Sequence, residues 1–282
     1  MTYDHHDVTL PLVRQPSQYL GCEINARRKD PGSVALRMLL AFPDLYEIGM
    51  SYQGLQILYQ ILNERPDIGA ERVFAPALDM ASLLRERGDP LRSLETGTPV
   101  GGFSIVGFSL LYELSYTNIL TMLDLSGIPF LSKDRDESHP LVIAGGPCTF
   151  NPEPMADIFD AMVVGDGENL VLRLADVWLA WRERDDDRGA LFDQWARLPG
   201  VYIPSLFRPR WDAAGNQGVV PRKSGYTGVT KSLLSDIDTV PPPERPIVPF
   251  GNPVHDRLSI EVCRGCTRGC RFCQAGMIYR PV

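Results

Sequence analysis

The run VALRMLLAF, residues 34–42, decides the fold of this chain. It is apolar at every position except Arg37, a pattern typical of a strand buried on both faces of a parallel sheet. Strands alternating with helices predict an α/β fold with a doubly wound, Rossmann-like parallel sheet. Further strands are expected at residues 71–74, 105–108, 141–144 and 161–164, and helices near residues 55–62, 81–87, 116–125 and 170–181.

Composition places the chain among ordinary globular proteins. It has 282 residues, of which 44% are hydrophobic and 22% charged, and this allows one or two domains with a sizeable core. A net charge of −7 argues against a broad nucleic-acid-binding surface. No apolar run is long enough to span a membrane or to act as a signal peptide. We therefore predict a cytoplasmic protein with reduced thiols.

Near the C-terminus, the run CTRGCRFC at residues 266–273 has the spacing C-x₃-C-x₂-C. Thiolates this close on one loop are typical ligands of an iron–sulfur cluster, and three of them leave one iron of a cubane open. Zinc is the weaker alternative. Cys263 with Cys266, and Cys270 with Cys273, could form two knuckles, but structural zinc sites usually separate their knuckles by a long spacer.

With Phe272 before the last cysteine, this run resembles the signature of the radical SAM enzymes. The string IEVCRGC, residues 260–266, is similar to the start of their catalytic barrel, with residues 258–262 as its first strand. The resemblance implies that Cys266, Cys270 and Cys273 bind a four-iron four-sulfur cluster. The open iron would bind S-adenosylmethionine, and one electron from a donor such as flavodoxin or ferredoxin would produce a 5′-deoxyadenosyl radical. By the same resemblance Cys263 is not a ligand.

A whole parallel β/α barrel takes ~200 residues or more, and only nine follow Cys273. We expect this chain to be the front part of a longer enzyme and to be inactive alone. The expected divisions are an N-terminal extension at 1–33, a cobalamin-binding-like domain at 34–185, a linker region at 186–256 and the start of the barrel at 257–282. The linker region should contain a helix, a hairpin of residues 207–211 and 219–222, and the extended run of prolines before the barrel.

Three loops that follow expected strands resemble, in order, the cobalamin-binding pattern D-x-H-x-x-G, S-x-L and G-G. The resemblance implies a channel for the nucleotide tail of cobalamin, whereas the residue types alone predict ordinary turns. A tyrosine stands where that family has its cobalt-coordinating histidine. Either cobalamin binds without a lower protein ligand or the domain has lost the cofactor. The residues carrying this resemblance are Asp44, Tyr46, Gly49, Ser109, Leu111, Gly145 and Gly146.

Charged residues outside these motifs have simpler explanations. The string GDGE, residues 165–168, predicts a turn with carboxylates at a helix N-terminus. The arginines around the cysteines, among them Arg264, are expected to balance the charge of an anionic cluster. Cys148 is interpreted as a small residue in a turn, and the pair His5 and His6 as part of a solvated tail.

The sequence therefore predicts a radical SAM protein whose intact form functionalises an unactivated C–H bond of an unknown substrate, with cobalamin-dependent methyl transfer as one outcome. A radical SAM enzyme that modifies tRNA is a rival, but such enzymes carry further cluster-binding cysteines, which Cys22 and Cys148 do not supply. A non-catalytic module that binds an iron–sulfur cluster or cobalamin is a second rival, and a zinc-stabilised binding protein is a third.

Overall fold

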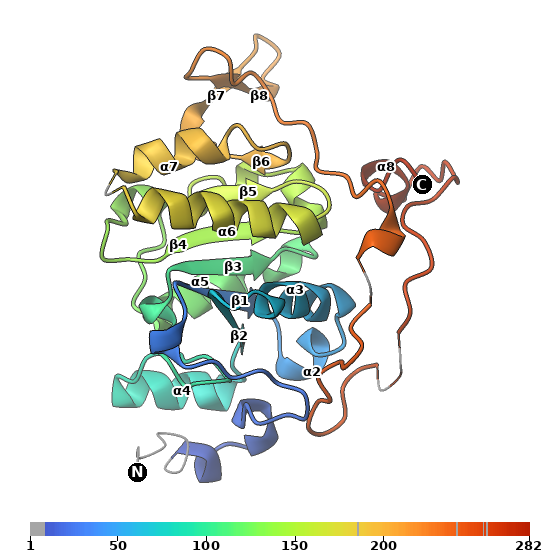
Figure 1. The fold of residues 1–282 in the computed structure, drawn as a ribbon. Helices are drawn as coiled ribbons and strands as arrows, with labels where there is room; N and C mark the ends of the chain where they lie inside the picture. The colour runs from blue at the N-terminus through green and yellow to red at the C-terminus, as the bar shows by residue number, and fades with distance from the viewer. Residues whose placement is uncertain (1–8, 185, 241, 256, 258) are drawn as a thin grey trace.

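A six-stranded sheet with the order β2-β1-β3-β4-β5-β6 forms the centre of the molecule (Figure 1). The structure, a computed structural model, describes residues 9–184, 186–240, 242–255, 257 and 259–282. Strands β1 to β5 run parallel, and β6 pairs antiparallel with β5. The strands are β1 (Leu36–Phe42), β2 (Ile68–Phe74), β3 (Ile105–Ser109), β4 (Leu141–Gly145), β5 (Ala161–Val163) and β6 (Val201–Tyr202).

Helices cover both faces of this sheet. Alternate residues of β1 show the two layers: Met38 and Leu40 join one buried apolar cluster, while Leu39 and Ala41 join the other. The first cluster takes in α3 (Gln53–Glu64), α6 (Glu168–Arg182) and α7 (Arg188–Trp195), and the second takes in α4 (Leu78–Arg87) and α5 (Tyr116–Leu125). The doubly wound α/β sheet predicted from the sequence is confirmed.

The strand order fixes where a ligand would bind. From β1 the chain adds β2 on one side and then β3, β4 and β5 on the other. In such sheets the connections leave a crevice outside the carboxyl ends of the strands, at the point where the order reverses. Here that point lies between β1 and β3, so the carboxyl edge there is the place to look for a site.

Most predicted elements are present, with shifts at their ends. Helix α5 covers the residues expected of it, and the hairpin is confirmed as β7 (Phe207–Trp211) and β8 (Gln217–Pro221). The helix expected in the linker region is α7, which begins at Arg188 because the side chain of Asp187 caps it by accepting the N–H of Ala190 at 2.8 Å. Strand β6 was not predicted, because two residues are too few to show the alternation of apolar and polar side chains that indicates a strand.

The first barrel strand expected at residues 258–262 is not formed. Leu258 lies outside the described residues, and residues 259–262 are in no strand. Ile260 and Val262 are 68% and 83% exposed. A parallel strand needs neighbouring strands for its backbone hydrogen bonds, and apolar alternation alone cannot supply them. His5 and His6 also lie outside the described residues.

After the hairpin, the chain returns along the side of the domain to the C-terminal helix α8 (Ala275–Ile278) (Figure 1). Residues 246–255 lie against the N-terminal extension and the short helix α2 (Tyr46–Gly49). Ile24 and Val248 form an antiparallel bridge, and the N–H of Val254 donates to the carbonyl of Glu47 at 3.2 Å. Within the described part of the chain, no helix combines the length and apolar character needed to cross a membrane.

Candidate functional site

Two of the three predicted loop motifs meet at the carboxyl edge of the sheet. Ser109 is in register with Gly145, and the N–H of Leu110 donates to the carbonyl of Gly145 at 2.7 Å. Gly146 has a φ of 120°, and a Cβ there would stand 2.5 Å from the carbonyl oxygen of Leu110. Only glycine permits this approach. The S-x-L and G-G segments are thus hydrogen-bonded neighbours.

The residues of the first motif lie elsewhere. Tyr46 is buried, and its hydroxyl donates to Glu23 Oε1 at 2.9 Å. The Tyr46 hydroxyl oxygen also accepts the N–H of Phe250 at 2.9 Å. A Cβ on Gly49 would stand 2.2 Å from the ring of Phe74, so this glycine serves packing. Asp44 accepts a hydrogen bond from Tyr112. Asp44 thus contacts the residue that follows Leu111, while Tyr46 and Gly49 pack inside the domain.

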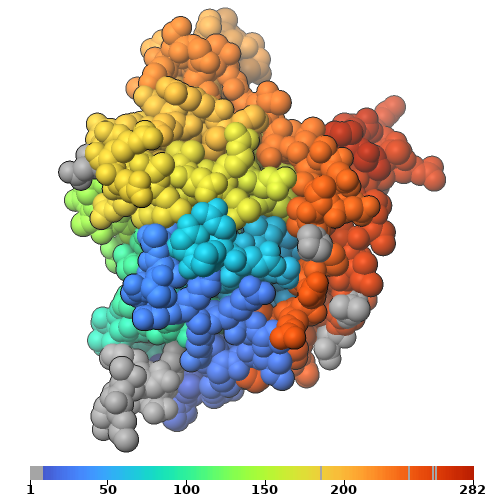
Figure 2. All heavy atoms as spheres, viewed as in Figure 1, coloured from blue at the N-terminus to red at the C-terminus, as the bar shows by residue number. Residues whose placement is uncertain are grey.

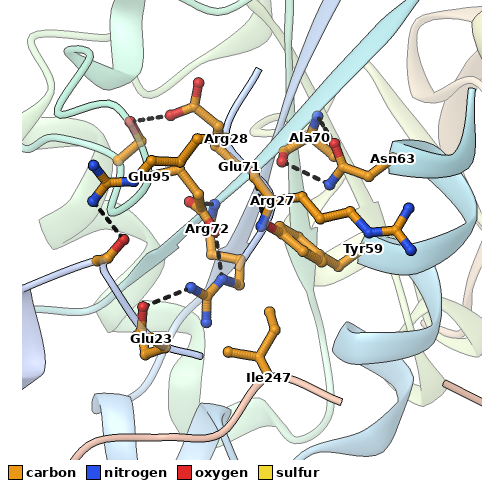
Figure 3. A network of polar contacts seen from close by, with 12 residues as sticks. Glu23, Arg27, Arg28, Tyr59, Asn63, Ala70, Glu71, Arg72, Glu95 and Ile247 are labelled. Atoms are coloured by element: carbon orange, nitrogen blue, oxygen red, sulfur yellow. Dashed lines mark hydrogen bonds and ion pairs between the residues drawn. The ribbon is translucent and has the colours of Figure 1, made fainter. Parts of the chain in front are cut away.

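Tyr46 adjoins a buried network that the sequence did not suggest. Arg72 of β2 is 1% exposed and lies between two carboxylates, with Nε 2.6 Å from Glu95 Oε1 and Nη2 3.1 Å from Glu23 Oε2 (Figure 3). Burial alone would lower the pKa of Arg72, but the charges of Glu95 and Glu23 outweigh it and raise that pKa. The sequence signal was a Glu-Arg pair inside a strand that is otherwise apolar.

A cavity of about 490 Å³ opens beside the glycine turns. Strands β1, β3, β4 and β5 and helices α3 and α6 form most of its wall. The C-terminal segment completes the wall with Glu261, residues 263–265 and residues 278–281. Ser109, Gly145 and Gly146 line this cavity, while Asp44, Tyr46, Gly49 and Leu111 are not among the residues that do. In the space-filling view, the orange linker lies against the cyan residues of α3, and the red C-terminal end lies farther out (Figure 2).

The GDGE turn connects this wall to the linker. Gly165 has a φ of 101° and forms a parallel bridge with Ser232. The N–H of Asp166 donates to the carbonyl of Ser232 at 2.9 Å, and Asp166 Oδ2 accepts the N–H of Leu234 at 2.7 Å. The turn thus holds the linker at the carboxyl end of β5.

Arg264 joins the cysteine-containing segment to the same turn. Its guanidinium lies 3.1 Å from Asp166 Oδ1 and 2.7 Å from Glu261 Oε1, and it also pairs with Glu168. Hydrogen bonding to Glu261, opposed by burial and supported by Glu168, raises the pKa of Arg264. From the sequence, Arg264 was expected to balance the charge of an anionic cluster. The structure corrects this expectation, because the guanidinium of Arg264 pairs with the carboxylates of Asp166, Glu168 and Glu261. Glu168 does begin α6 as expected, but its side chain also binds Arg264.

The three motif cysteines lie on one loop, with free thiols. The N–H of Cys273 donates to the carbonyl of Cys270 at 3.1 Å, and the N–H of Arg268 donates to Cys266 Sγ at 3.4 Å. Phe272 is 93% exposed. Among the described residues, no three Cys, His, Asp or Glu side chains are gathered closely enough to hold a metal ion. The donor chemistry and the loop fit an iron–sulfur cluster, since thiolates on one short loop are its usual ligands.

The remaining cysteines differ in environment. Cys148 is buried beside the glycine turn, and burial raises the pKa of its thiol, which makes it a poor nucleophile at neutral pH. Cys263 is exposed and also borders the cavity. Cys22 is exposed on the N-terminal extension.

Comparison with known proteins adds two findings. A family model described as radical SAM proteins, N-terminal, matches residues 54–204, from α3 through β6. An uncharacterised protein of Methanocaldococcus jannaschii is 24% identical over 245 residues, which cover 86% of this chain and 41% of that protein. The chain thus spans about two fifths of the length of the curated relative it matches.

Proposed function

The chain belongs to the radical SAM family, and from that premise we propose that Cys266, Cys270 and Cys273 bind a four-iron four-sulfur cluster. The spacing of the three thiols on one loop carries this proposal, together with the N–H that Arg268 directs at Cys266 Sγ. When bound, such a cluster supplies an open iron for S-adenosylmethionine and the electron that cleaves its C–S bond. Three protein ligands, rather than four, are what that chemistry requires.

In this proposal the other residues of the segment hold the loop against the domain. Gly265 has a φ of 84°, and a Cβ there would stand 2.1 Å from the carbonyl oxygen of Tyr279. Only glycine therefore allows the chain to turn at this position. Arg264 fixes the same turn to Asp166 and Glu168, about one hundred residues earlier in the sequence. Cys263 precedes this turn and belongs to the wall of the cavity.

Anaerobic cluster reconstitution of the full chain tests the proposal. Iron and acid-labile sulfide should reach four of each per chain, and Cys266→Ala, Cys270→Ala or Cys273→Ala should each abolish this content. Cys263→Ala is the matched control and should retain it. An equal loss in Cys263→Ala, or zinc bound without sulfide, would contradict the assignment of ligands.

Electron paramagnetic resonance of the reduced cluster tests whether the cluster has an open iron that binds S-adenosylmethionine. A signal that shifts when S-adenosylmethionine is added supports an open iron and a catalytic role in the intact protein. A signal that ignores S-adenosylmethionine means either that the part of the barrel in this chain cannot hold the cosubstrate or that Cys263 closes the site as a fourth ligand. For the intact protein we propose a flavodoxin- or ferredoxin-type electron donor and radical attack on a C–H bond. Cobalamin is not part of this proposal, and the Tyr46 hydroxyl, which stands in place of the cobalt-coordinating histidine, donates to Glu23.

A further inference from the structure

The three motif cysteines lie within a loop whose two ends touch. We call residues 265–279 the cysteine loop. A Cβ on Gly265 would stand 2.1 Å from the carbonyl oxygen of Tyr279, so the backbone at the two ends is in direct contact. Inside the loop, a Cβ on Gly276 would stand 3.1 Å from the carbonyl oxygen of Arg268, which brings α8 close to the stretch between the first two cysteines. Compact loops with neighbouring ends are frequently functional.

The side chain of Lys231, in the linker, holds the second end of the cysteine loop. Its ammonium group donates to the carbonyl of Ile278 at 2.9 Å and to the carbonyl of Arg280, one on each side of Tyr279. The same group lies 5.8 Å from the centre of the Phe150 ring, in the short turn that follows β4. An ammonium group has three N–H donors, so one lysine can bind two backbone carbonyls of the same segment.

The backbone beside Lys231 is itself fixed to the sheet. The N–H of Ser232 donates to the carbonyl of Val164 at 2.8 Å, directly after β5, and the carbonyl of Ser232 accepts the N–H of Asp166 at 2.9 Å. Arg264, at the first end of the cysteine loop, binds the side chain of Asp166. Both ends of the loop are therefore held at the carboxyl end of β5, one by Arg264 and the other by Lys231.

We propose that Lys231 is a positioning residue for the cluster, a role that rests on the proposed function of the three cysteines. Together with Arg264, it fixes both ends of the cysteine loop to the domain. A loop fixed at both ends has little conformational freedom left to lose when its thiolates bind iron, so the bound cluster should release iron slowly. Neither side chain is a ligand, and both act by fixing the backbone of the loop.

The rate of iron release tests this role. We would reconstitute the full chain anaerobically, add an excess of the iron chelator bathophenanthroline disulfonate, and follow the release by absorbance. Lys231→Met should still assemble four irons, but it should release them at least about tenfold faster than the native protein, because two hydrogen bonds from a charged group are lost. Lys231→Arg keeps charged N–H donors and should release iron at an intermediate rate.

Lys29→Met is the matched control. The ammonium group of Lys29 also donates to two backbone carbonyls, those of Arg65 and Ile68, but at the amino end of β2. This variant should lower the free energy of unfolding in urea without changing the rate of iron release. Lys231→Met should do the reverse, which separates a positioning role from a general loss of stability.

Hydrogen exchange of the cluster-free protein distinguishes failure of this inference from failure of the proposed function. The amides of Cys273 and Met277, which donate within the loop, should exchange faster in Lys231→Met than in the native protein or in Lys29→Met. A native chain that assembles no cluster contradicts the proposed function, and the exchange rates then decide whether Lys231 holds the loop. Iron release at the native rate in Lys231→Met, unchanged exchange, or equal effects in Lys29→Met would each overturn the inference.

Discussion

Two arginines of this chain each hold several carboxylates, but in different surroundings. Arg72 lies in the centre of the domain between Glu23 and Glu95, and its side chain is 1% exposed. Arg264 lies at the edge of the cavity among Asp166, Glu168 and Glu261, and its side chain is 24% exposed. The first ties the N-terminal extension to β2, and the second ties the cysteine-containing segment to the start of α6.

The difference in burial predicts different roles. Removing one partner of a buried ion pair leaves an uncompensated charge in a medium of low dielectric constant, and this is strongly destabilising. A partly exposed pair is screened by water, and its removal costs little. We therefore expect Arg72 to act on the stability of the whole domain and Arg264 to act on the position of one segment.

The largest expected effect is that of Arg72→Met. It should lower the free energy of unfolding by about 3–5 kcal/mol, measured by urea denaturation. Burial raises the pKa of Glu95, and the charge of Arg72 lowers it, so removing Arg72 raises that pKa further. Glu95 then takes up a proton at a higher pH in the variant than in the native protein, and the loss should shrink toward acidic pH. Arg85→Met, which removes an exposed pair with Asp124, is the control and should change little.

A smaller effect is expected for Tyr46→Phe. The variant removes the hydroxyl that donates to Glu23 and accepts from Phe250, which should cost about 2 kcal/mol of unfolding free energy. Tyr112→Phe is the control, because the Tyr112 hydroxyl binds Asp44 at an exposed position. If both variants cost the same, Tyr46 is not a buried link between the extension and residues 246–255.

The smallest effect on stability is expected for Arg264→Met. Its loss should be below about 1 kcal/mol in urea denaturation. Hydrogen exchange should nonetheless accelerate at the backbone amides around Gly265 and in the linker near Ser232, because the segment loses its link to the GDGE turn. Arg264→Lys keeps the charge but not the forked geometry, and should give an intermediate rate. A cost as large as that of Arg72→Met would remove the distinction between the two networks.

Local patterns were sufficient for the sheet and most of its helices. The apolar run of β1 and the helical spacing of α3 depend only on neighbouring residues, so they are visible in the sequence. The same reasoning was wrong for residues 258–262. Their alternation of apolar and polar residues favours a strand, but it supplies no neighbouring strand for the backbone hydrogen bonds. It gave no sign that the Tyr46 hydroxyl binds Glu23, whereas Ser109 and Gly145 line the cavity.

The sequence by itself determined the alternation of strands and helices and the close spacing of Cys266, Cys270 and Cys273. Both are properties of adjacent residues and hold wherever the segment lies. Only the tertiary structure decided that Arg264 meets Glu168 and that Arg72 lies between Glu23 and Glu95. These contacts join residues tens to about one hundred positions apart. They depend on strand order and on the return path of the chain, which no local period specifies.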